Sequence, residues 1–320
     1  MQNLTFKQLR NLTEDEAREM LESIRWNGNT VCPHCQSTEA YKLTPKGDTK
    51  TKVRKGVYKC KACRKQFTVT VGTIFEGSRI KIADWLMAIY LMCSSKKGIS
   101  AHQLHRTIGV TYKTAWFMAH RIRHAMMQEP LAELIKGEVE ADETYIGGRE
   151  KNKHANKRTE GTRGRSTKTK TPVFALVERG GELRAQKVSN VTSQNIKSII
   201  REHVSPSATL MTDQYPIYNG LDQEFAGHEV VDHGAGEYVN GNAHTNTLEG
   251  WFALLKRGVT GTFHHVSEQH LDRYVDEFAF RYNRRDISDA ERTVSAIRKI
   301  GGKRLTYKGA KGVRTNVLKP

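Results

Sequence analysis

Two Cys-x-x-Cys pairs near the N-terminus constrain the fold of this chain more than any other feature. They are Cys32-Pro33-His34-Cys35 and Cys60-Lys61-Ala62-Cys63, separated by 24 residues. Each pair can hold one side of a tetrahedral metal ion, and four thiolates together close such a site around zinc. Between them, Tyr41–Leu43 and Val57–Lys59 have the composition of short strands around a polar turn. The segment therefore predicts a zinc ribbon, with a single structural Zn²⁺ bound by Cys32, Cys35, Cys60 and Cys63.

Two other interpretations of these cysteines are weaker. A redox dithiol would need a βαβ context that neither pair has, and two such pairs seldom occur by chance in one short segment. The fifth cysteine, Cys93, lies in an apolar run and is interpreted as a buried thiol. A zinc closed by four cysteines has no open position for a substrate, so we expect a structural or docking module. Its surrounding lysines and arginines fit phosphate contact and a solvated surface equally well.

The charge of the chain favours a polyanionic partner. Lys and Arg number 52 against 34 Asp and Glu, which leaves a net charge of +18, and the sequence pI is about 9.7. A positive field of this size attracts nucleic acid. General solubility and attraction to a membrane surface are the alternatives, but the basic residues cluster in particular segments and do not coat one amphipathic helix.

Nothing in the sequence indicates a membrane segment or an export signal. The longest apolar run, Trp85–Cys93, is nine residues, whereas a membrane span needs about 20. Charges are mixed throughout the first twenty residues, with no apolar core of a signal peptide. We therefore expect a cytoplasmic protein with no membrane contact.

The region from Lys81 to about Gln128 has a helical pattern with two breaks. The first break is at Lys96-Lys97-Gly98, and the second is a tight turn at Gly109-Val110. Ser100 and Thr111 stand where the two following helices would be capped, which is the pattern of a helix-turn-helix. Turn-linked helices also occur in ordinary bundles, but the charge favours DNA binding, with contacts from Tyr112, Lys113, His120, Arg121 and Arg123.

Two aspartates follow a strand pattern in the second half of the chain. Asp142 lies within the strand-like segment 137–146, and a hairpin follows over 173–177 and 183–188. A helix over about 193–203 then leads to the strand 208–212, which ends at Asp213. Three antiparallel strands followed by a helix and a further strand are typical of an RNase H-like fold, a mixed α/β sheet with helices. Asp142 and Asp213 would then share a metal on adjacent strands.

A third acid, Glu249, lies on a predicted helix whose apolar residues are Leu248, Phe252 and Leu255. Lys256 follows it by two helical turns and projects from about the same face. Carboxylates of this kind hold two divalent cations for displacement at phosphorus, and a lysine beside them can hold a phosphate. An exposed acid and base on a surface helix is the alternative, which the two aspartates make less attractive.

Basic segments flank these acids. Residues 149–170 contain nine Lys or Arg and two acids, and residues 298–320 contain eight basic residues and no acid. Both fit contact with a DNA backbone or a solvated segment. The candidate DNA contacts in the chain are Lys113, Arg121, Arg123, Lys151, Lys153, Lys157, Arg158 and Arg257.

The chain resembles the DDE-type transposases of bacterial insertion sequences, in the ISXO-like group that carries an N-terminal zinc ribbon. The resemblance runs from about Cys32 to Asp286. Its carriers are the two cysteine pairs with Phe67 and Gly72-Thr73, the strand Glu140-Ala-Asp142-Glu-Thr-Tyr-Ile-Gly-Gly148, Thr212-Asp213, His244-Thr-Asn-Thr-Leu-Glu249-Gly-Trp-Phe-Ala-Leu-Leu-Lys256-Arg-Gly258, and the segment from Gly261 to Arg284.

This resemblance implies an RNase H-like catalytic domain, two Mg²⁺ (or Mn²⁺) ions, and transposition by hydrolysis followed by strand transfer. Asp142, Asp213 and Glu249 carry over as the metal ligands, with Lys256 as a catalytic lysine and Asn246 as the alternative third ligand. The implied partners are the terminal repeats of the element and target DNA, and pairing of two ends implies a homo-oligomer. The implied location is the nucleoid in the cytoplasm of a bacterium. Glu140, on the same strand face as Asp142, is expected to have a structural role.

We expect four regions: an N-terminal helix and zinc ribbon (1–73), a helix-turn-helix-like region (74–130), the catalytic domain (131–290) and a basic tail (291–320). Two other functions stay open. One is a zinc-ribbon DNA-binding regulator whose catalytic domain is retired, which the intact acids disfavour. The other is an RNase H-like nuclease that cuts DNA without joining it.

Overall fold

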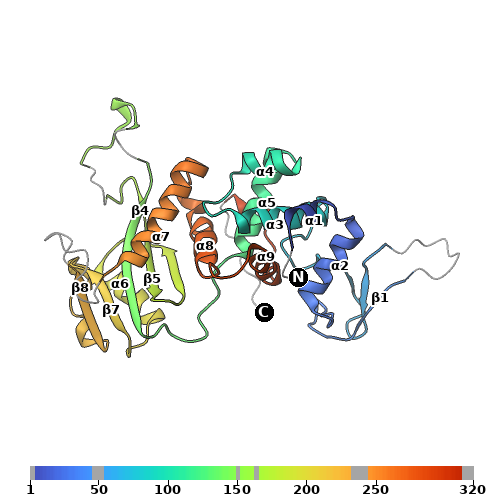
Figure 1. The fold of residues 1–320 in the computed structure, drawn as a ribbon, viewed down its shortest axis with the longest axis horizontal. Coiled ribbons are helices and arrows are strands. Elements are labelled where there is room, and N and C mark those ends of the chain that lie inside the picture. The colour runs from blue at the N-terminus through green and yellow to red at the C-terminus, as the bar shows by residue number, and fades with distance from the viewer. Residues whose placement is uncertain (1–3, 45–53, 149–151, 162–165, 232–243, 312–320) are drawn as a thin grey trace. The chain divides into compact units, whose positions relative to one another are not determined.

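The computed structural model describes residues 4–44, 54–148, 152–161, 166–231 and 244–311. These residues form two compact units (Figure 1). The first unit comprises residues 1–126 and 286–320, and the second comprises residues 127–285. Each unit has its own core. No helix in the part of the chain that the structure describes is both long and apolar enough to span a membrane.

The first unit begins with two capped helices, α1 (Phe6–Arg10) and α2 (Glu14–Trp26). Thr13 starts α2 with a capping box, in which its hydroxyl accepts from the Glu16 amide and the Glu16 carboxylate accepts from the Thr13 amide. Such a reciprocal pair satisfies amides that have no partner inside the helix. The start of α2 is therefore encoded locally.

A three-stranded antiparallel sheet with the order β1-β2-β3 follows α2. Its strands are β1 (Ala40–Lys42), β2 (Tyr58–Cys60) and β3 (Gln66–Phe67), so the two predicted ribbon strands are confirmed. In Figure 1, β1 lies beside α2. Glu22 joins α2 to the sheet, because its carboxylate accepts from the Tyr58 hydroxyl of β2 at 2.7 Å and from the Lys42 ammonium of β1 at 3.1 Å.

Three further helices follow the ribbon: α3 (Ile82–Ser94), α4 (Ala101–Ile108) and α5 (Tyr112–Ala125). Ser100 and Thr111 cap α4 and α5 with their hydroxyl groups, as the sequence predicts. Between these two helices, Gly109 adopts a left-handed conformation (φ +81°) that suits glycine. The prediction of two helices joined by a tight turn is therefore confirmed.

The segment after residue 288 contributes to the core of the first unit, although the sequence pattern suggested a tail from residue 291. Helix α9 (Asp289–Arg298) packs against α3, and α10 (Tyr307–Ala310) packs against α5. Ala296, Ile297 and Ile300 are at most 1% exposed. Burial of these apolar side chains offsets the basic charge of the segment, which is why part of it folds. Residues 312–320 lie outside the described residues.

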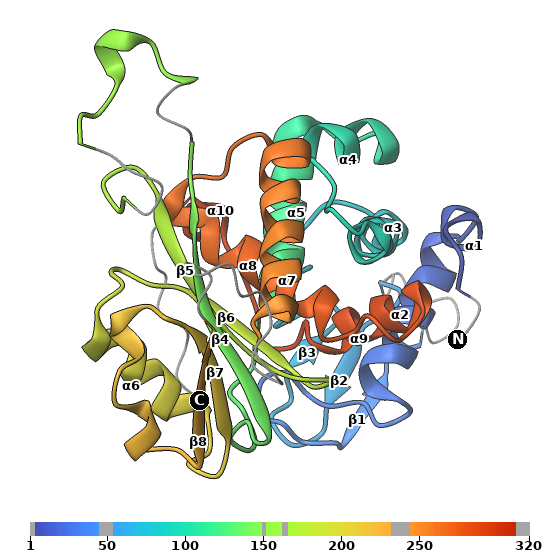
Figure 2. The same cartoon turned by 60° about the vertical axis from the view of Figure 1, so that its left-hand side comes forward.

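The second unit is built on a five-stranded mixed sheet with the order β6-β5-β4-β7-β8 (Figure 2). Strands β4 (Glu138–Ile146), β5 (Thr171–Glu178) and β6 (Leu183–Lys187) are antiparallel neighbours. On the other side of β4, β7 (Thr209–Asp213) and β8 (Gly227–Val231) run parallel to it. This arrangement confirms the predicted RNase H-like fold, to which β8 adds a strand that the sequence pattern did not indicate.

Helices cover both faces of this sheet. Helix α6 (Ser193–His203) packs on one face against Val139 and Ala141 of β4. Helices α7 (Asn246–Arg257) and α8 (Leu271–Tyr282) pack on the opposite face against Val173 and Ala175 of β5. Side chains alternate along a strand. Since Val139 and Ala141 face α6, Glu140 and Asp142 of β4 face α7.

Shorter helical turns connect these elements. They are η2 (Ala155–Lys157), η3 (Pro216–Tyr218), η4 (Leu221–Gln223), the π-helix η6 (Gly258–Phe263) and η7 (Glu268–His270).

Two side-chain amides cover the free edge of β6. Asn283 accepts from the Leu183 amide at 2.8 Å and donates to the Leu183 carbonyl at 2.9 Å. Gln128 forms the same pair of bonds with Ala185, at 3.2 and 2.7 Å. These amides take the place of a neighbouring strand, so the edge does not present unpaired backbone groups at these residues to another chain.

Candidate metal centre and DNA-facing residues

The strand register brings Asp142 and Asp213 level with each other. Strands β4 and β7 are parallel neighbours that pair Glu138 with Thr209 and Glu140 with Met211. The same offset, continued by two residues, places Asp142 opposite Asp213 at the end of β7. Neighbouring strands lie about 4.8 Å apart. The two aspartates therefore stand side by side on the sheet, as the sequence predicts for acids that share a metal.

Glu249 comes to this site from α7, which covers the same face of the sheet. Leu248, Phe252 and Leu255 are at most 4% exposed and hold the helix on the sheet, while Glu249 is exposed. Its charge acts on Asp142. Asn246, the alternative third ligand, is the first residue of the same helix and is also exposed. Both lie in the first turn of α7.

The carboxylates repel one another strongly at this site. Burial is the largest of the causes that raise the pKa of Asp142 to about 8, and the negative charges of Glu143, Asp213 and Glu249 act in the same direction. The Glu143 amide opposes this shift by donating to Asp142 Oδ1 at 2.7 Å. A cation bound among these carboxylates would relieve their repulsion, and oxygen donors of this kind are the ligands that Mg²⁺ prefers. The donor set therefore fits a divalent cation.

Lys256 belongs to the same electrostatic neighbourhood. Its side chain reaches solvent, yet packing around the ammonium group lowers its pKa, while the charges of Asp142 and Glu249 act in the opposite direction. Lys256 is thus close enough to Asp142 and Glu249 for their charges to affect its pKa. An exposed ammonium group at this position suits contact with a phosphate.

The opposite face of β4 holds a separate buried contact. Glu143 is 8% exposed and accepts from the hydroxyl of Tyr218 at 3.0 Å. Burial, together with the charge of Glu143, raises the pKa of Tyr218 well above its usual value. This confirms that Glu143 points away from the face that carries Asp142.

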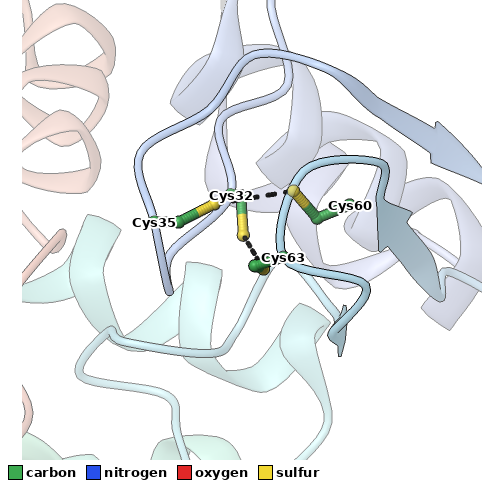
Figure 3. Close-up of side chains that lie close together, drawn as sticks. All are labelled: Cys32, Cys35, Cys60 and Cys63. Atoms are coloured by element: carbon green, nitrogen blue, oxygen red, sulfur yellow. Dashed lines mark hydrogen bonds between the residues drawn. The ribbon is translucent and has the colours of Figure 1, made fainter.

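The four cysteines of the ribbon converge, as Figure 3 shows. Their sulfur atoms all lie within 4.8 Å of one another. Cys32 Sγ is 3.7 Å from Cys63 Sγ, and Cys35 Sγ is 3.6 Å from Cys60 Sγ. Sulfurs held about 2.3 Å from a tetrahedral zinc are separated by roughly 3.8 Å, so these distances fit a structural zinc. Among the described residues, these four sulfurs are the group of possible metal ligands whose atoms all lie within 4.8 Å of one another. The carboxylate oxygens of Asp142, Asp213 and Glu249 are spaced more widely than that.

Backbone donors help to prepare the ribbon for a metal. The Cys63 amide donates to the Cys60 thiol and is the main cause that lowers the pKa of Cys60 to about 7. A thiol with a lowered pKa is deprotonated more readily, and the thiolate is the form that binds zinc. The first cysteine of each pair, Cys32 and Cys60, is completely buried.

The predicted DNA contacts fall into two groups. Arg121 and Arg123 are 5% and 2% exposed, and Arg121 donates to the carbonyls of Leu305 at 3.0 Å and Glu76 at 2.7 Å. The prediction that these two arginines contact DNA is therefore wrong, because both are buried in the first unit. His120 is likewise completely buried. The candidates that are exposed are Tyr112, Lys113, Lys153, Lys157, Arg158 and Arg257, whereas Lys151 lies outside the described residues.

The sequence pattern gave no indication of Arg179, which contacts Glu140 near the acids. It lies in the hairpin turn between β5 and β6, where an arginine is usually a surface residue. Its guanidinium group binds Glu138 and Glu140 of β4, each at 3.1 Å. In the sequence, the feature that could have indicated such a contact is the pair Glu138 and Glu140 on alternate residues of β4. A buried carboxylate requires a cationic partner.

Two models of known protein families match this chain. A family model described as the ISXO2-like transposase domain matches residues 134–283. A second, described as the transposase zinc-ribbon domain, matches residues 12–66. An uncharacterized protein in transposable element ISH50 of Halobacterium salinarum is 33% identical over 278 residues, covering 84% of this chain and 91% of that protein. An uncharacterized transposase-like protein of Haemophilus influenzae is 27% identical over 100 residues, covering 31% of this chain and 80% of that protein.

Proposed function

Because the chain belongs to the family of ISXO2-like transposases, we propose that it cuts DNA at the ends of an insertion sequence and joins them to target DNA. The observation that carries this proposal is the cluster of acids in the second unit. Asp142 and Asp213 stand level on adjacent parallel strands, and α7 brings Glu249 to the same face. Three carboxylates in this arrangement suit a two-metal phosphoryl-transfer site.

Each residue of the site has a proposed role. Asp142 and Asp213 bind Mg²⁺ (or Mn²⁺) ions, and Glu249 completes their ligands. Two such ions, when bound, activate a water or a 3′ hydroxyl for in-line attack and stabilise the leaving oxygen. Lys256 holds a phosphate next to the scissile bond as a point charge. The negative charges of Asp142 and Glu249 favour the protonated form of Lys256 and so counteract the effect of burial, which lowers its pKa.

The remaining basic residues hold DNA. Lys113 at the start of α5, together with Lys153, Lys157 and Arg158 in the segment before β5, is exposed and presents positive charge. Contacts of this kind with phosphates supply affinity without reading sequence. The zinc ribbon and the helices of residues 74–130 then recognise the terminal repeats. Pairing of two ends requires a homo-oligomer, and such a protein acts on the nucleoid.

The test is a cleavage and joining assay with purified zinc-loaded protein, Mg²⁺ and a labelled duplex that carries the terminal repeat. Wild type is compared with Asp142→Ala and with Asp222→Ala, an exposed aspartate of the same unit. We expect nicked and joined products from wild type and the control, and neither from Asp142→Ala. Cutting without joining would refute transposition in favour of a nuclease. Tight binding without metal-dependent cutting would leave a DNA-binding regulator.

A second comparison decides the third ligand. Glu249→Gln and Asn246→Ala remove the two candidates from the same turn of α7. If Glu249 is the ligand, Glu249→Gln abolishes cleavage, whereas Asn246→Ala preserves it. The reverse result would assign the position to Asn246.

A further inference from the structure

Glu140 of β4 is completely buried, and donors from two separate segments of the chain surround its carboxylate. Oε1 accepts from Arg179 Nε at 3.1 Å and from the Thr247 hydroxyl at 2.8 Å. Oε2 accepts from the Leu248 backbone amide at 3.0 Å. His244 Nδ1 also lies 3.2 Å from Oε1. Since both oxygens accept hydrogen bonds from other segments of the protein, Glu140 anchors those segments to β4.

Helix α7 needs this anchor because its own N-terminal residue does not cap it. Thr245, at the N-cap position, has φ −114° and ψ 21°, and its side chain makes no capping hydrogen bond. The first amides of a helix have no partner inside the helix and require an acceptor. Glu140 supplies that acceptor from the sheet, because Leu248 is the third residue of α7. A carboxylate at this end is also favoured by the helix dipole.

Arg179 ties the anchor to its surroundings. Besides Glu140, its guanidinium group donates to Glu138 at 3.1 Å and to the His244 carbonyl at 3.0 Å. The side chain of Arg179 is 16% exposed and that of Glu140 is 0% exposed. Arg179 therefore neutralises the buried carboxylate and also holds the backbone just before α7, which limits where the first turn of the helix can lie.

The position of Glu140 connects this anchor to the acids. It lies two residues before Asp142 on the same face of β4, and its partner Leu248 comes directly before Glu249. The negative charge of Asp213, and that of Asp142 once it has lost its proton, would push Glu249 away in the absence of a cation. We propose that Glu140 is a positioning residue that fastens the first turn of α7 to β4 and so holds Glu249 beside Asp142 before metal binds. This inference rests on the proposed metal-dependent function of the same site.

Amide hydrogen exchange of the zinc-loaded protein without Mg²⁺ tests the anchor directly. In Glu140→Gln, the amides of Leu248 and Glu249 are expected to exchange faster by about tenfold to a hundredfold, the range for loss of a charge-assisted hydrogen bond. Thr247→Val removes one donor and keeps the carboxylate, so we expect a smaller increase. Glu138→Gln is the matched control, since Glu138 accepts from the same Arg179 guanidinium group and lies two residues before Glu140 on β4.

Binding of Mn²⁺ alone, followed by the electron paramagnetic resonance signal of the free ion, tests the consequence. If Glu140 positions Glu249, the half-saturating Mn²⁺ concentration rises by roughly tenfold in Glu140→Gln, while affinity for the terminal-repeat duplex without metal stays at the wild-type value. Glu138→Gln retains wild-type Mn²⁺ binding. A general structural defect would instead lower DNA affinity and raise exchange throughout residues 127–285.

Wild-type exchange at Leu248 and Glu249 in both Glu140→Gln and Thr247→Val would overturn the proposal. So would faster exchange at these amides with unchanged Mn²⁺ binding, because the anchor would then not serve the acids. If Glu140→Gln does not fold, Thr247→Val decides the same question. A wild-type protein that folds with protected α7 amides but binds no Mn²⁺ would refute both the metal site and its positioning, whereas absence of joining alone would affect only the proposed function.

Discussion

Asp142→Asn is expected to stabilise the folded protein when Mg²⁺ is absent, although it removes a proposed catalytic ligand. Burial, followed by the charges of Glu143, Asp213 and Glu249, raises the pKa of Asp142 to about 8, whereas an aspartate in an unfolded chain has a pKa of about 3.9. The folded state therefore binds this proton more tightly than the unfolded state. The stability that it contributes is complete below pH ~4 and is lost as the pH rises towards 8.

The size of the effect follows from this pKa difference. Each pH unit between the two pKa values changes the free energy of unfolding by about 1.4 kcal/mol, which sets an upper limit of about 4 kcal/mol between pH 5 and pH 8. Asp142 is partly exposed, and solvent screening reduces the figure, so we expect Asp142→Asn to gain about 1–3 kcal/mol at pH 8. Asparagine keeps the oxygen that accepts from the Glu143 amide.

The measurement is urea unfolding of zinc-loaded protein in magnesium-free buffer at pH 5 and pH 8. Asp222→Asn, at an exposed position of the same unit, serves as the control and is expected to change stability by less than about 0.5 kcal/mol. Adding Mg²⁺ at pH 8 should then stabilise wild type but not Asp142→Asn, because only the protein with an intact site binds the ion. No gain for Asp142→Asn at pH 8, or an equal gain at both pH values, would refute the reasoning.

Three further predictions concern the zinc, the buried arginine and the sheet edge. Cys60→Ser should abolish zinc retention, measured by metal analysis, and make the ribbon sensitive to protease, because a structural zinc supplies much of the folding energy of so small a sheet; a zinc-loaded variant would contradict this. Arg121→Met should lower stability by about 1–3 kcal/mol in thermal unfolding, because two carbonyl acceptors lose a charged donor, and leave DNA affinity unchanged. Lys113→Ala should leave stability unchanged, weaken DNA binding, and lower the salt dependence of that binding by about one ion. Weaker DNA binding by folded Arg121→Met would contradict the prediction for the buried arginine. Asn283→Ala should cost about 1–3 kcal/mol in urea unfolding, because the amide and carbonyl of Leu183 lose their partner, and should increase light scattering at high concentration; unchanged stability would mean that water replaces the side chain.

Features carried by short stretches of sequence were predicted well. The cysteine spacing indicated the ribbon, and the hydroxyl residues Ser100 and Thr111 marked the starts of two helices. Alternation along β4 separated Asp142 from Glu143. In each case the determining interaction involves residues only a few positions apart, so the local pattern contains the information.

Burial of charged residues was not predictable in this way. The pattern of α5 showed basic residues on a helix, which suggested DNA contacts from Arg121 and Arg123. Whether such a residue faces solvent depends on the elements that pack over it, and for Arg121 one partner is Leu305, 184 residues away. Strand β8 was missed for a related reason, because the residues that pair with it belong to β7 and its own sequence is half exposed.

The amino-acid sequence by itself determined the ribbon, the helix caps, the strands that carry Asp142 and Asp213, and the helix that carries Glu249. Only the tertiary structure decided that the two aspartates are level, through the register of β4 and β7. It alone also revealed that Glu140 anchors α7 through Leu248, which is 108 residues away. The physical reason is that a buried carboxylate must find its donors wherever the folded chain places them, and no local pattern specifies partners so distant.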